Sequence, residues 1–152
     1  MEKDLTVLLA EIDQVRTDMG KVVQEVDTKL MIYPGWTIKE MIAHITAWEI
    51  VIHKAFQAYI AGDPPYFLRE QDFDIFNEDA VAIRASWSME QVLKEWKDVR
   101  ENLKKTIQKL KETDLPLEMV LPWGSERTVA ELIEIIGEHE GEHMKDTIKA
   151  SG

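Results

Sequence analysis

Three of the four histidines in the chain fall where an amphipathic helix would place core residues. His139 and His143 are four residues apart, so in a helix both imidazoles leave the same face one turn apart. His44 lies far upstream, in a second amphipathic segment. If the two helices pack through these faces, three imidazoles meet at one point. Such a group is typical of a transition-metal site with an open coordination position.

Each of these histidines, taken alone, also fits a structural role at the edge of the core, hydrogen-bonded to a backbone carbonyl or to water. Burying three imidazoles without partners would cost roughly 1–3 kcal/mol each, so their shared inward placement favours a common ligand. The fourth histidine, His53, follows His44 by nine residues and therefore points away from it, alongside Glu49 and Gln57. We expect His53 to lie at the surface.

Four long segments repeat apolar residues at helical spacing and carry charged residues on the opposite side. They span approximately residues 5–26, 38–60, 88–110 and 129–143. The last three begin with capping-box pairs, which are Thr37 with Glu40, Ser88 with Gln91, and Thr128 with Glu131. Between the second and third segments, residues 73–81 predict a short crossover helix, and residues 117–125 predict an extended or turn segment. The pattern predicts an all-α fold, a four-helix bundle with a short helix in the crossover between helices two and three.

Composition and charge narrow the classes of function. We expect a single domain over residues 1–152, because a chain of 152 residues that is 45% hydrophobic suffices for one continuous core. The absence of cysteine excludes disulfides, thiolate metal sites and a thiol nucleophile supplied by the protein. Neither a basic leader nor an apolar run of the ~20 residues of a membrane span is present, so we expect a cytoplasmic protein without a membrane partner. The formal net charge of −11 would repel phosphate backbones, and we expect no nucleic-acid partner.

Two motifs in the chain resemble those of the DinB/YfiT-like superfamily. In that family the second helix begins at a Gly-Trp-Ser/Thr turn and carries one metal-binding histidine, which matches Gly35–Thr37 and His44 here. The last long helix of the family carries H-x-x-x-H, which matches His139 and His143. The resemblance covers nearly the whole chain, although residues 73–77 of the crossover match only some branches. It implies a metal site formed by His44, His139 and His143.

The resemblance also implies a divalent metal ion, zinc or nickel, and a homodimer, which would cover surplus apolar surface. The family includes metal-dependent transferases that use low-molecular-weight thiols, and isomerases of related mechanism. A metal held by three neutral imidazoles keeps an open position, where it can acidify water or bind a thiolate. We therefore expect a metal-dependent transferase or hydrolase acting on a small-molecule substrate, with a low-molecular-weight thiol as a possible cosubstrate. A non-catalytic bundle that binds metal or a small ligand, for sensing or sequestration, stays open as the alternative.

Several other residues could assist this chemistry, although each also has a simpler role. Glu40 could act as a general acid or base but caps a helix, and Glu138, Glu140 and Glu142 form an acidic run expected in solvent. Large side chains could wall an apolar substrate pocket or only pack the core, namely Trp36, Trp48, Trp87, Trp96, Trp123, Met41 and Met144. Asn77 and Arg84, in the crossover, could orient a polar ligand or serve at the surface or as caps.

Overall fold

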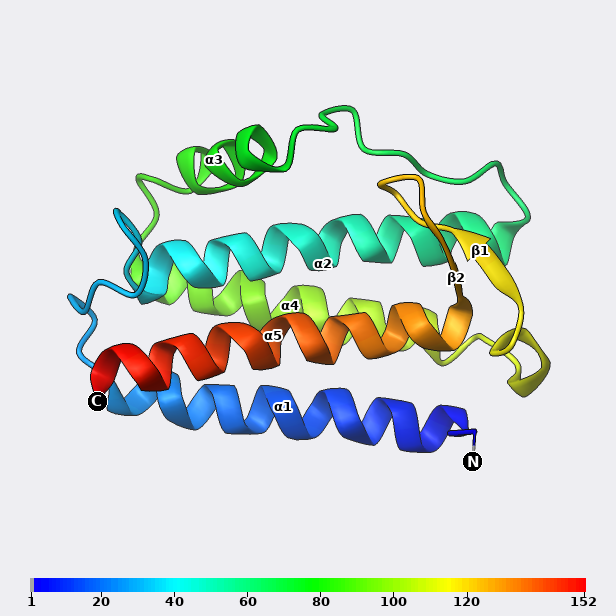
Figure 1. Cartoon of the computed structure of the whole chain (residues 1–152), viewed down its shortest axis with the longest axis horizontal. Helices are drawn as coiled ribbons and strands as arrows, with labels where there is room; N and C mark the ends of the chain where they lie inside the picture. Colours follow the sequence, from blue (N-terminus) through cyan, green and yellow to red (C-terminus); the bar gives the residue numbers. More distant parts are fainter. Residues whose placement is uncertain (1) are drawn as a thin grey trace.

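The computed structural model describes residues 2–152, in which four long helices form a bundle (Figure 1). The long helices are α1 (Leu5–Glu25), α2 (Ile38–Ala61), α4 (Met89–Ile107) and α5 (Val129–Ser151). The shorter α3 (Phe73–Ile83) lies in the crossover between α2 and α4, and a 3-10 turn, Glu112–Asp114, follows α4. The predicted bundle with a crossover helix is confirmed.

Side-chain caps fix where the helices begin. The three predicted capping boxes are present at the starts of α2, α4 and α5. The carboxylates of Asp4 and Asp72 cap α1 and α3, accepting hydrogen bonds from backbone N–H groups of the first turn. At the other end of α2, Gly62 has φ +73°, a left-handed conformation that costs glycine little and ends the helix.

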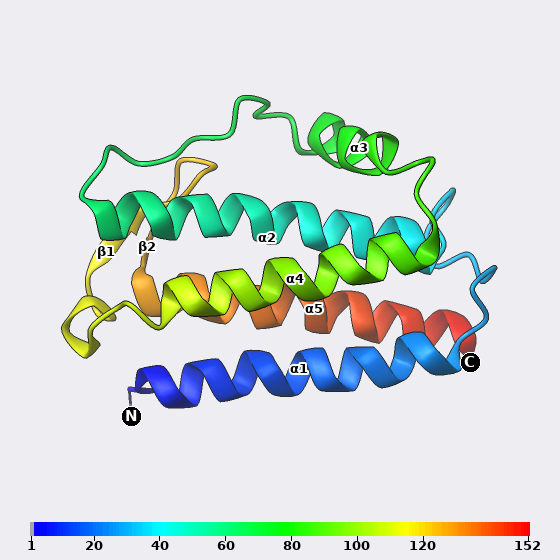
Figure 2. The same ribbon diagram turned by 180° about the vertical axis from the view of Figure 1, so that it is seen from behind.

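The crossover decides which helix ends lie together. Helix α2 runs opposite to α1, and the crossover then returns the chain along α2, so that α4 runs parallel to α2 and α5 parallel to α1 (Figures 1 and 2). The α1–α2 connection, the start of α2, α3 and the C-terminal half of α5 consequently lie at the same end of the bundle. Residues distant in sequence can therefore form one site at this end.

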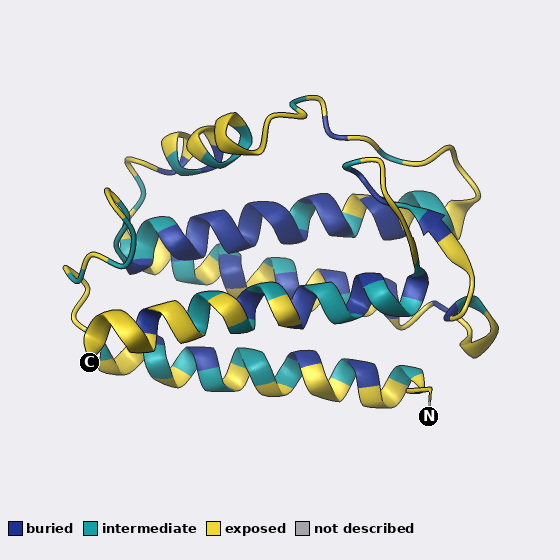
Figure 3. Ribbon diagram, in the orientation of Figure 1, coloured by how far each residue is buried: buried dark blue, intermediate teal, exposed yellow. Residues whose placement is uncertain are grey.

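The core occupies the space between the four long helices, with α2 the most deeply buried of them (Figure 3). Phe56 and Leu103 belong to an apolar cluster in the half of the bundle near the hairpin, and Met41 and Val92 belong to a second cluster near the start of α2. The crossover covers the side of α2 that the other long helices leave open, where Trp48 packs with Leu68. Burial on nearly all sides explains the high apolar content of α2.

The segment after the 3-10 turn contains a hairpin that the sequence pattern did not predict. Strand β1 (Glu118–Val120) pairs antiparallel with β2 (Glu126–Thr128), and the turn between them includes Gly124 with φ +97°. Strands of three residues are too short for an alternating pattern to be recognised. The turn packs on the crossover, where the Leu68 N–H donates to the Pro122 carbonyl over 3.0 Å. The hairpin thus places Trp123 against Trp48 of α2, with ring centroids 5.8 Å apart.

None of the helices in residues 2–152 combines the length and the apolar character needed to cross a membrane.

Candidate metal centre

The three histidines predicted to share a ligand point their Nε2 atoms at one another. The Nε2 atom of His44 lies 3.1 Å from that of His139 and 3.0 Å from that of His143, and the last two are 3.0 Å apart. His44 comes from the second turn of α2, whereas His139 and His143 come from successive turns of α5. The fold therefore joins side chains that are 95 residues or more apart in sequence.

These separations fit a metal ion of ordinary bond length. With metal–nitrogen bonds of about 2.0–2.1 Å, two imidazole nitrogens lie about 2.9 Å apart at a right angle and about 3.4 Å apart at a tetrahedral angle. The observed 3.0–3.1 Å falls between these limits. The group formed by His44, His139 and His143 could hold a metal ion through three nitrogens.

Asn77 on α3 determines which ring nitrogen of His44 carries the proton. The Asn77 Oδ1 atom is 2.8 Å from Trp48 Nε1 and 2.9 Å from His44 Nδ1. An indole N–H can only donate, so the shared atom is an acceptor and His44 Nδ1 also carries its proton. The Nε2 atom of a neutral His44 then presents a lone pair to the other histidines.

Tyr33, in the α1–α2 connection, has the same effect on His143. Its hydroxyl donates to the carboxylate of Asp146 and lies 2.8 Å from His143 Nδ1. Burial, reinforced by the hydrogen bond to Asp146, raises the pKa of Tyr33, so the phenol keeps its proton. Since that proton points to Asp146, the hydroxyl oxygen accepts from His143 Nδ1, and His143 Nε2 is also a lone-pair atom.

The electrostatic environment keeps the imidazoles neutral. Burial, with a further contribution from the neighbouring His143, lowers the pKa of His44 to about 4 and that of His139 to about 3. Burial also lowers the pKa of His143, against the opposing effect of nearby carboxylates. At neutral pH the lone pairs of at least two Nε2 atoms face the same point. These lone pairs repel one another unless a cation lies between them.

Two cavities adjoin the three histidines, and His44 and Asn77 line both of them. The first has a volume of about 290 Å³, and its other lining residues are Trp48, Ile52, Phe73, Trp123, Ile135 and His139. The second has a volume of about 560 Å³, and its other lining residues are Tyr33, Pro34, Trp36, Asp74, Glu78, His143 and Asp146. The first cavity is apolar and aromatic, whereas the second is polar and acidic.

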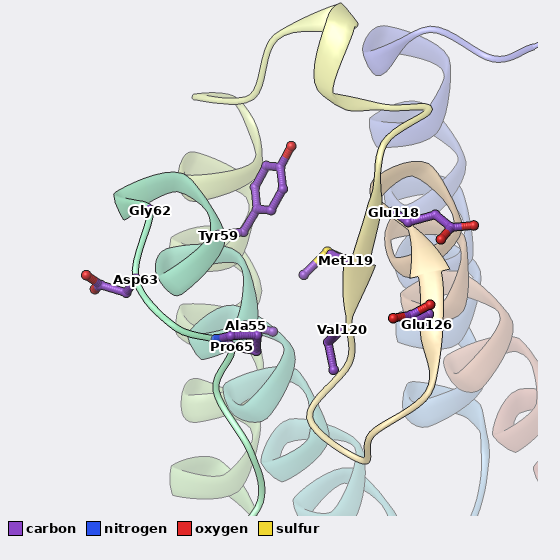
Figure 4. A pocket seen from close by; sticks show the side chains of 9 residues that line it. All are labelled: Ala55, Tyr59, Gly62, Asp63, Pro65, Glu118, Met119, Val120 and Glu126. Atoms are coloured by element: carbon purple, nitrogen blue, oxygen red, sulfur yellow. The ribbon is translucent and has the colours of Figure 1, made fainter.

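A further pocket of about 320 Å³ lies at the opposite end of α2, between that helix and the hairpin (Figure 4). Ala55 and Tyr59 line it together with Met119, and the carboxylates of Glu118 and Glu126 lie on the hairpin side. Ala55, the first residue of the chain that lines this pocket, is eleven residues beyond His44, which corresponds to about 16 Å along the helix axis. No histidine is among its described lining residues.

The sequence interpretation of Glu140 and Glu49 was wrong. Glu140 was expected in a solvated acidic run and Glu49 on the surface face with His53, but their side chains are 0% and 2% exposed. Both carboxylates pair with Arg16 and Arg100, and Trp96 Nε1 donates to Glu140 over 3.0 Å. The arginines at inward positions of α1 and α4, Arg16 and Arg100, were the signal in the sequence that could have revealed these partners. Glu138 and Glu142 are exposed as expected.

The remaining candidates separate into site residues and packing residues. Trp36 lies against His44 with ring centroids 5.1 Å apart, and Asn77 orients His44 as described. Arg84, expected at the surface or in a cap, is the C-cap residue of α3, where it is buried, donates to the Ala80 carbonyl over 2.8 Å and pairs with Glu95 over 2.6 Å.

Other residues serve packing and capping. Trp87 and Trp96 pack on Arg84 and Arg16, and Met41 and Met144 pack in the core. Glu40 accepts from the backbone and hydroxyl of Thr37 in its capping box. His53, expected at the surface, is half-buried and lies 2.6 Å from the Thr106 hydroxyl.

Comparisons with known proteins establish the family and the fold. A family model described as the DinB superfamily matches residues 11–146, a range that includes all three histidines and confirms the resemblance found in the sequence. No curated protein matches the chain. Among solved structures, the sibling lethal factor precursor DfsB is 17% identical with a TM-score of 0.80, covering 98% of this chain and 95% of its own.

Two further structures share the fold. The mycothiol-dependent maleylpyruvate isomerase is 14% identical with a TM-score of 0.78, covering 95% of this chain and 60% of its own. The colibactin self-resistance protein ClbS, solved in complex with double-stranded DNA, is 12% identical with a TM-score of 0.79, covering 98% of this chain and 96% of its own.

The ClbS complex corrects the expectation of no nucleic-acid partner. That expectation rested on the net charge of −11, yet a protein with this fold is seen with double-stranded DNA. Net charge averages over the whole surface, whereas binding depends on the local distribution of charge, so the total cannot exclude such a partner. The expected homodimer is likewise not shown by the single chain described over residues 2–152.

Proposed function

The chain belongs to the DinB superfamily, and from this premise we propose that it is a metal-dependent enzyme. In this proposal His44, His139 and His143 bind one divalent ion, zinc or nickel, through their Nε2 atoms. The reaction is transfer or hydrolysis, in which a low-molecular-weight thiol or a water molecule attacks a small electrophile. The observation that carries the proposal is the convergence of three Nε2 atoms within 3.0–3.1 Å.

A divalent ion held by three neutral imidazoles retains its full charge and a free coordination position, and can lower the pKa of water or of a thiol into the neutral range. The chain's own residues prepare the site for this ion. Asn77 and Tyr33 each accept a hydrogen bond from the Nδ1–H of one histidine, which leaves the Nε2 lone pair of that histidine facing inward. The low pKa values of His44 and His139 mean that metal does not have to displace protons from them at neutral pH.

The two cavities support a catalytic role over simple metal storage. A reaction between a nucleophile and an electrophile needs room for both beside the metal, and His44 borders an apolar space and a polar space. The polar cavity of about 560 Å³ can hold the polar part of a low-molecular-weight thiol. A thiol cosubstrate also agrees with the lack of cysteine in the chain and with the mycothiol-dependent isomerase that shares the fold.

Metal content of purified variants tests the binding site. We expect about one divalent ion per wild-type chain and a strong loss of affinity in His44→Ala, His139→Ala or His143→Ala. His53→Ala is the matched control, because His53 lies on the same helix as His44 but bonds to Thr106 instead. Undiminished stoichiometry and affinity in His44→Ala would reject the site.

Turnover tests the catalytic part. Metal-loaded protein is assayed with a panel of small electrophiles, with and without added thiol, against free metal at equal concentration. We expect turnover that disappears on chelation and in His139→Ala, and returns when metal is restored to the wild type. Activity that survives loss of the three histidines would exclude this mechanism. A bound metal that exchanges neither water nor thiol would instead indicate a binding or sequestering protein.

A further inference from the structure

We propose that the electrophile carries a small, uncharged planar group, such as a single aromatic ring, which binds in the apolar cavity beside His44 and His139. This inference rests on the proposed function, because it assumes that the reacting atoms of the same molecule reach the metal. It concerns the substrate class, which neither the metal site nor the family determines.

The walls of this cavity are aromatic rings from three separate elements. The indole of Trp48, on α2, lies 5.2 Å from the ring of Phe73 at 80° and 5.8 Å from the indole of Trp123 at 75°. Phe73 begins α3 and Trp123 lies in the hairpin turn. Rings set nearly perpendicular to one another can receive a planar guest that stacks on one and meets the edge of another. The arrangement therefore favours a flat ligand.

The polarity of the lining indicates that the guest is uncharged. Trp48, Phe73 and Trp123 are joined by Ile52 and Ile135, and among the described lining residues there is no carboxylate, lysine or arginine. The polar lining residues are His44, His139 and Asn77, and Asn77 Oδ1 already accepts two hydrogen bonds. A charged group placed here would lose its hydration without meeting a side chain of opposite charge among these lining residues.

The cavity is large enough for one aromatic ring. An apolar cavity of about 150 Å³ is enough to hold benzene. The volume of about 290 Å³ here accommodates a ring together with the reacting atoms that extend toward His44 and His139.

Phe73 supplies a second observation in favour of an apolar guest. Its side chain lines the cavity and is nevertheless 45% exposed, so a ligand that covers it removes apolar surface from water. Phe67, on the same crossover, is 51% exposed and is not among the lining residues of the cavity. The two phenylalanines make a matched pair, since both can be shortened with little disturbance of the core.

Two hydroxamates, which bind divalent metals through the same two oxygens, test the proposal by calorimetry on the zinc-loaded protein. Acetohydroxamate reports the open coordination position alone, and benzohydroxamate adds one aromatic ring. We expect benzohydroxamate to bind about ten-fold tighter or more, as the burial of a ring predicts. Phe73→Ala should lower this ratio about three- to ten-fold, while Phe67→Ala should keep the wild-type ratio.

The outcomes separate the two proposals. If acetohydroxamate binds but benzohydroxamate gains nothing, or if Phe73→Ala and Phe67→Ala change the ratio equally, the aromatic cavity is not the substrate site and the inference is overturned. If acetohydroxamate fails to bind a zinc-loaded protein, the open coordination position is absent. The proposed function then fails, and the inference fails with it.

Discussion

Glu49 on α2 and Glu140 on α5 accept hydrogen bonds from the same two arginines. Arg100, on α4, donates to Glu49 over 2.8 and 3.0 Å and to Glu140 over 3.1 Å. Arg16, on α1, donates to Glu49 over 2.7 Å and to Glu140 over 2.9 and 3.0 Å. One residue from each long helix thus forms a cluster with two positive and two negative charges. The three histidines lie on α2 and α5, and the charge cluster links these two helices through Glu49 and Glu140. It therefore holds the two helices in the relative position that the metal site requires.

Arg100→Met should lower the free energy of unfolding by about 3–5 kcal/mol, because it leaves Arg16 as the one remaining cation of the cluster beside the two buried carboxylates of Glu49 and Glu140. Urea denaturation of the metal-free protein measures the change. Lys97→Met, an exposed position on the same helix, is the control and should stay within about 0.5 kcal/mol of wild type. Equal stability of the two variants would show that the charge cluster does not hold the helices together.

Asn77→Ala should weaken zinc affinity about 10- to 100-fold while leaving the helical fold intact. The substitution removes the oxygen that keeps the proton of His44 on Nδ1, so His44 Nε2 no longer presents a lone pair in every molecule. Competition with a chelator of known affinity gives the value. Asp79→Ala, exposed on the same helix, should bind zinc as wild type does, and an equal loss in both variants would contradict the role of Asn77.

Tyr33→Phe should also weaken zinc binding, by about ten-fold, because the hydroxyl that joins His143 to Asp146 is lost. The ring itself remains to pack on His143, whose centroid is 5.7 Å away, so the thermal unfolding temperature should change little. Tyr66→Phe removes a hydroxyl from the crossover, away from His143, and serves as the control. Wild-type affinity in Tyr33→Phe would show that His143 needs no hydroxyl partner.

The stability of the metal-free protein should decrease on acidification below about pH 6.5. Folding lowers the pKa of His44 from 6.5 to about 4 and that of His139 to about 3, so below pH 6.5 the unfolded chain binds more protons than the folded one. Stability is then fully present above pH 6.5 and is lost as the pH falls toward these lower values, by up to about 1.4 kcal/mol per pH unit for each histidine.

Urea denaturation at several pH values with a chelator present measures this slope. His139→Ala removes one of the titrating groups and should flatten the curve between pH 4 and 6.5. An identical slope in the variant would mean that other groups control the acid response.

Helix periodicity and capping boxes made most of the fold predictable from sequence, because both depend on residues within a few positions of each other. The same locality made His139 and His143 recognisable as a pair on one helix face. The participation of His44 followed from its inward position and from the family resemblance. The hairpin escaped prediction, since three-residue strands carry too little periodic signal.

Only the tertiary structure decided which residues surround the histidines. Tyr33 belongs to the connection between α1 and α2, and Asn77 belongs to the short helix of the crossover that folds back over α2. No local pattern marks them as partners of His143 and His44. The burial of Glu140 was equally hidden, because a carboxylate within an acidic run looks solvated until arginines from two other helices meet it. Sequence spacing determines which face of a helix a residue occupies, whereas the packing of helices determines what that face meets.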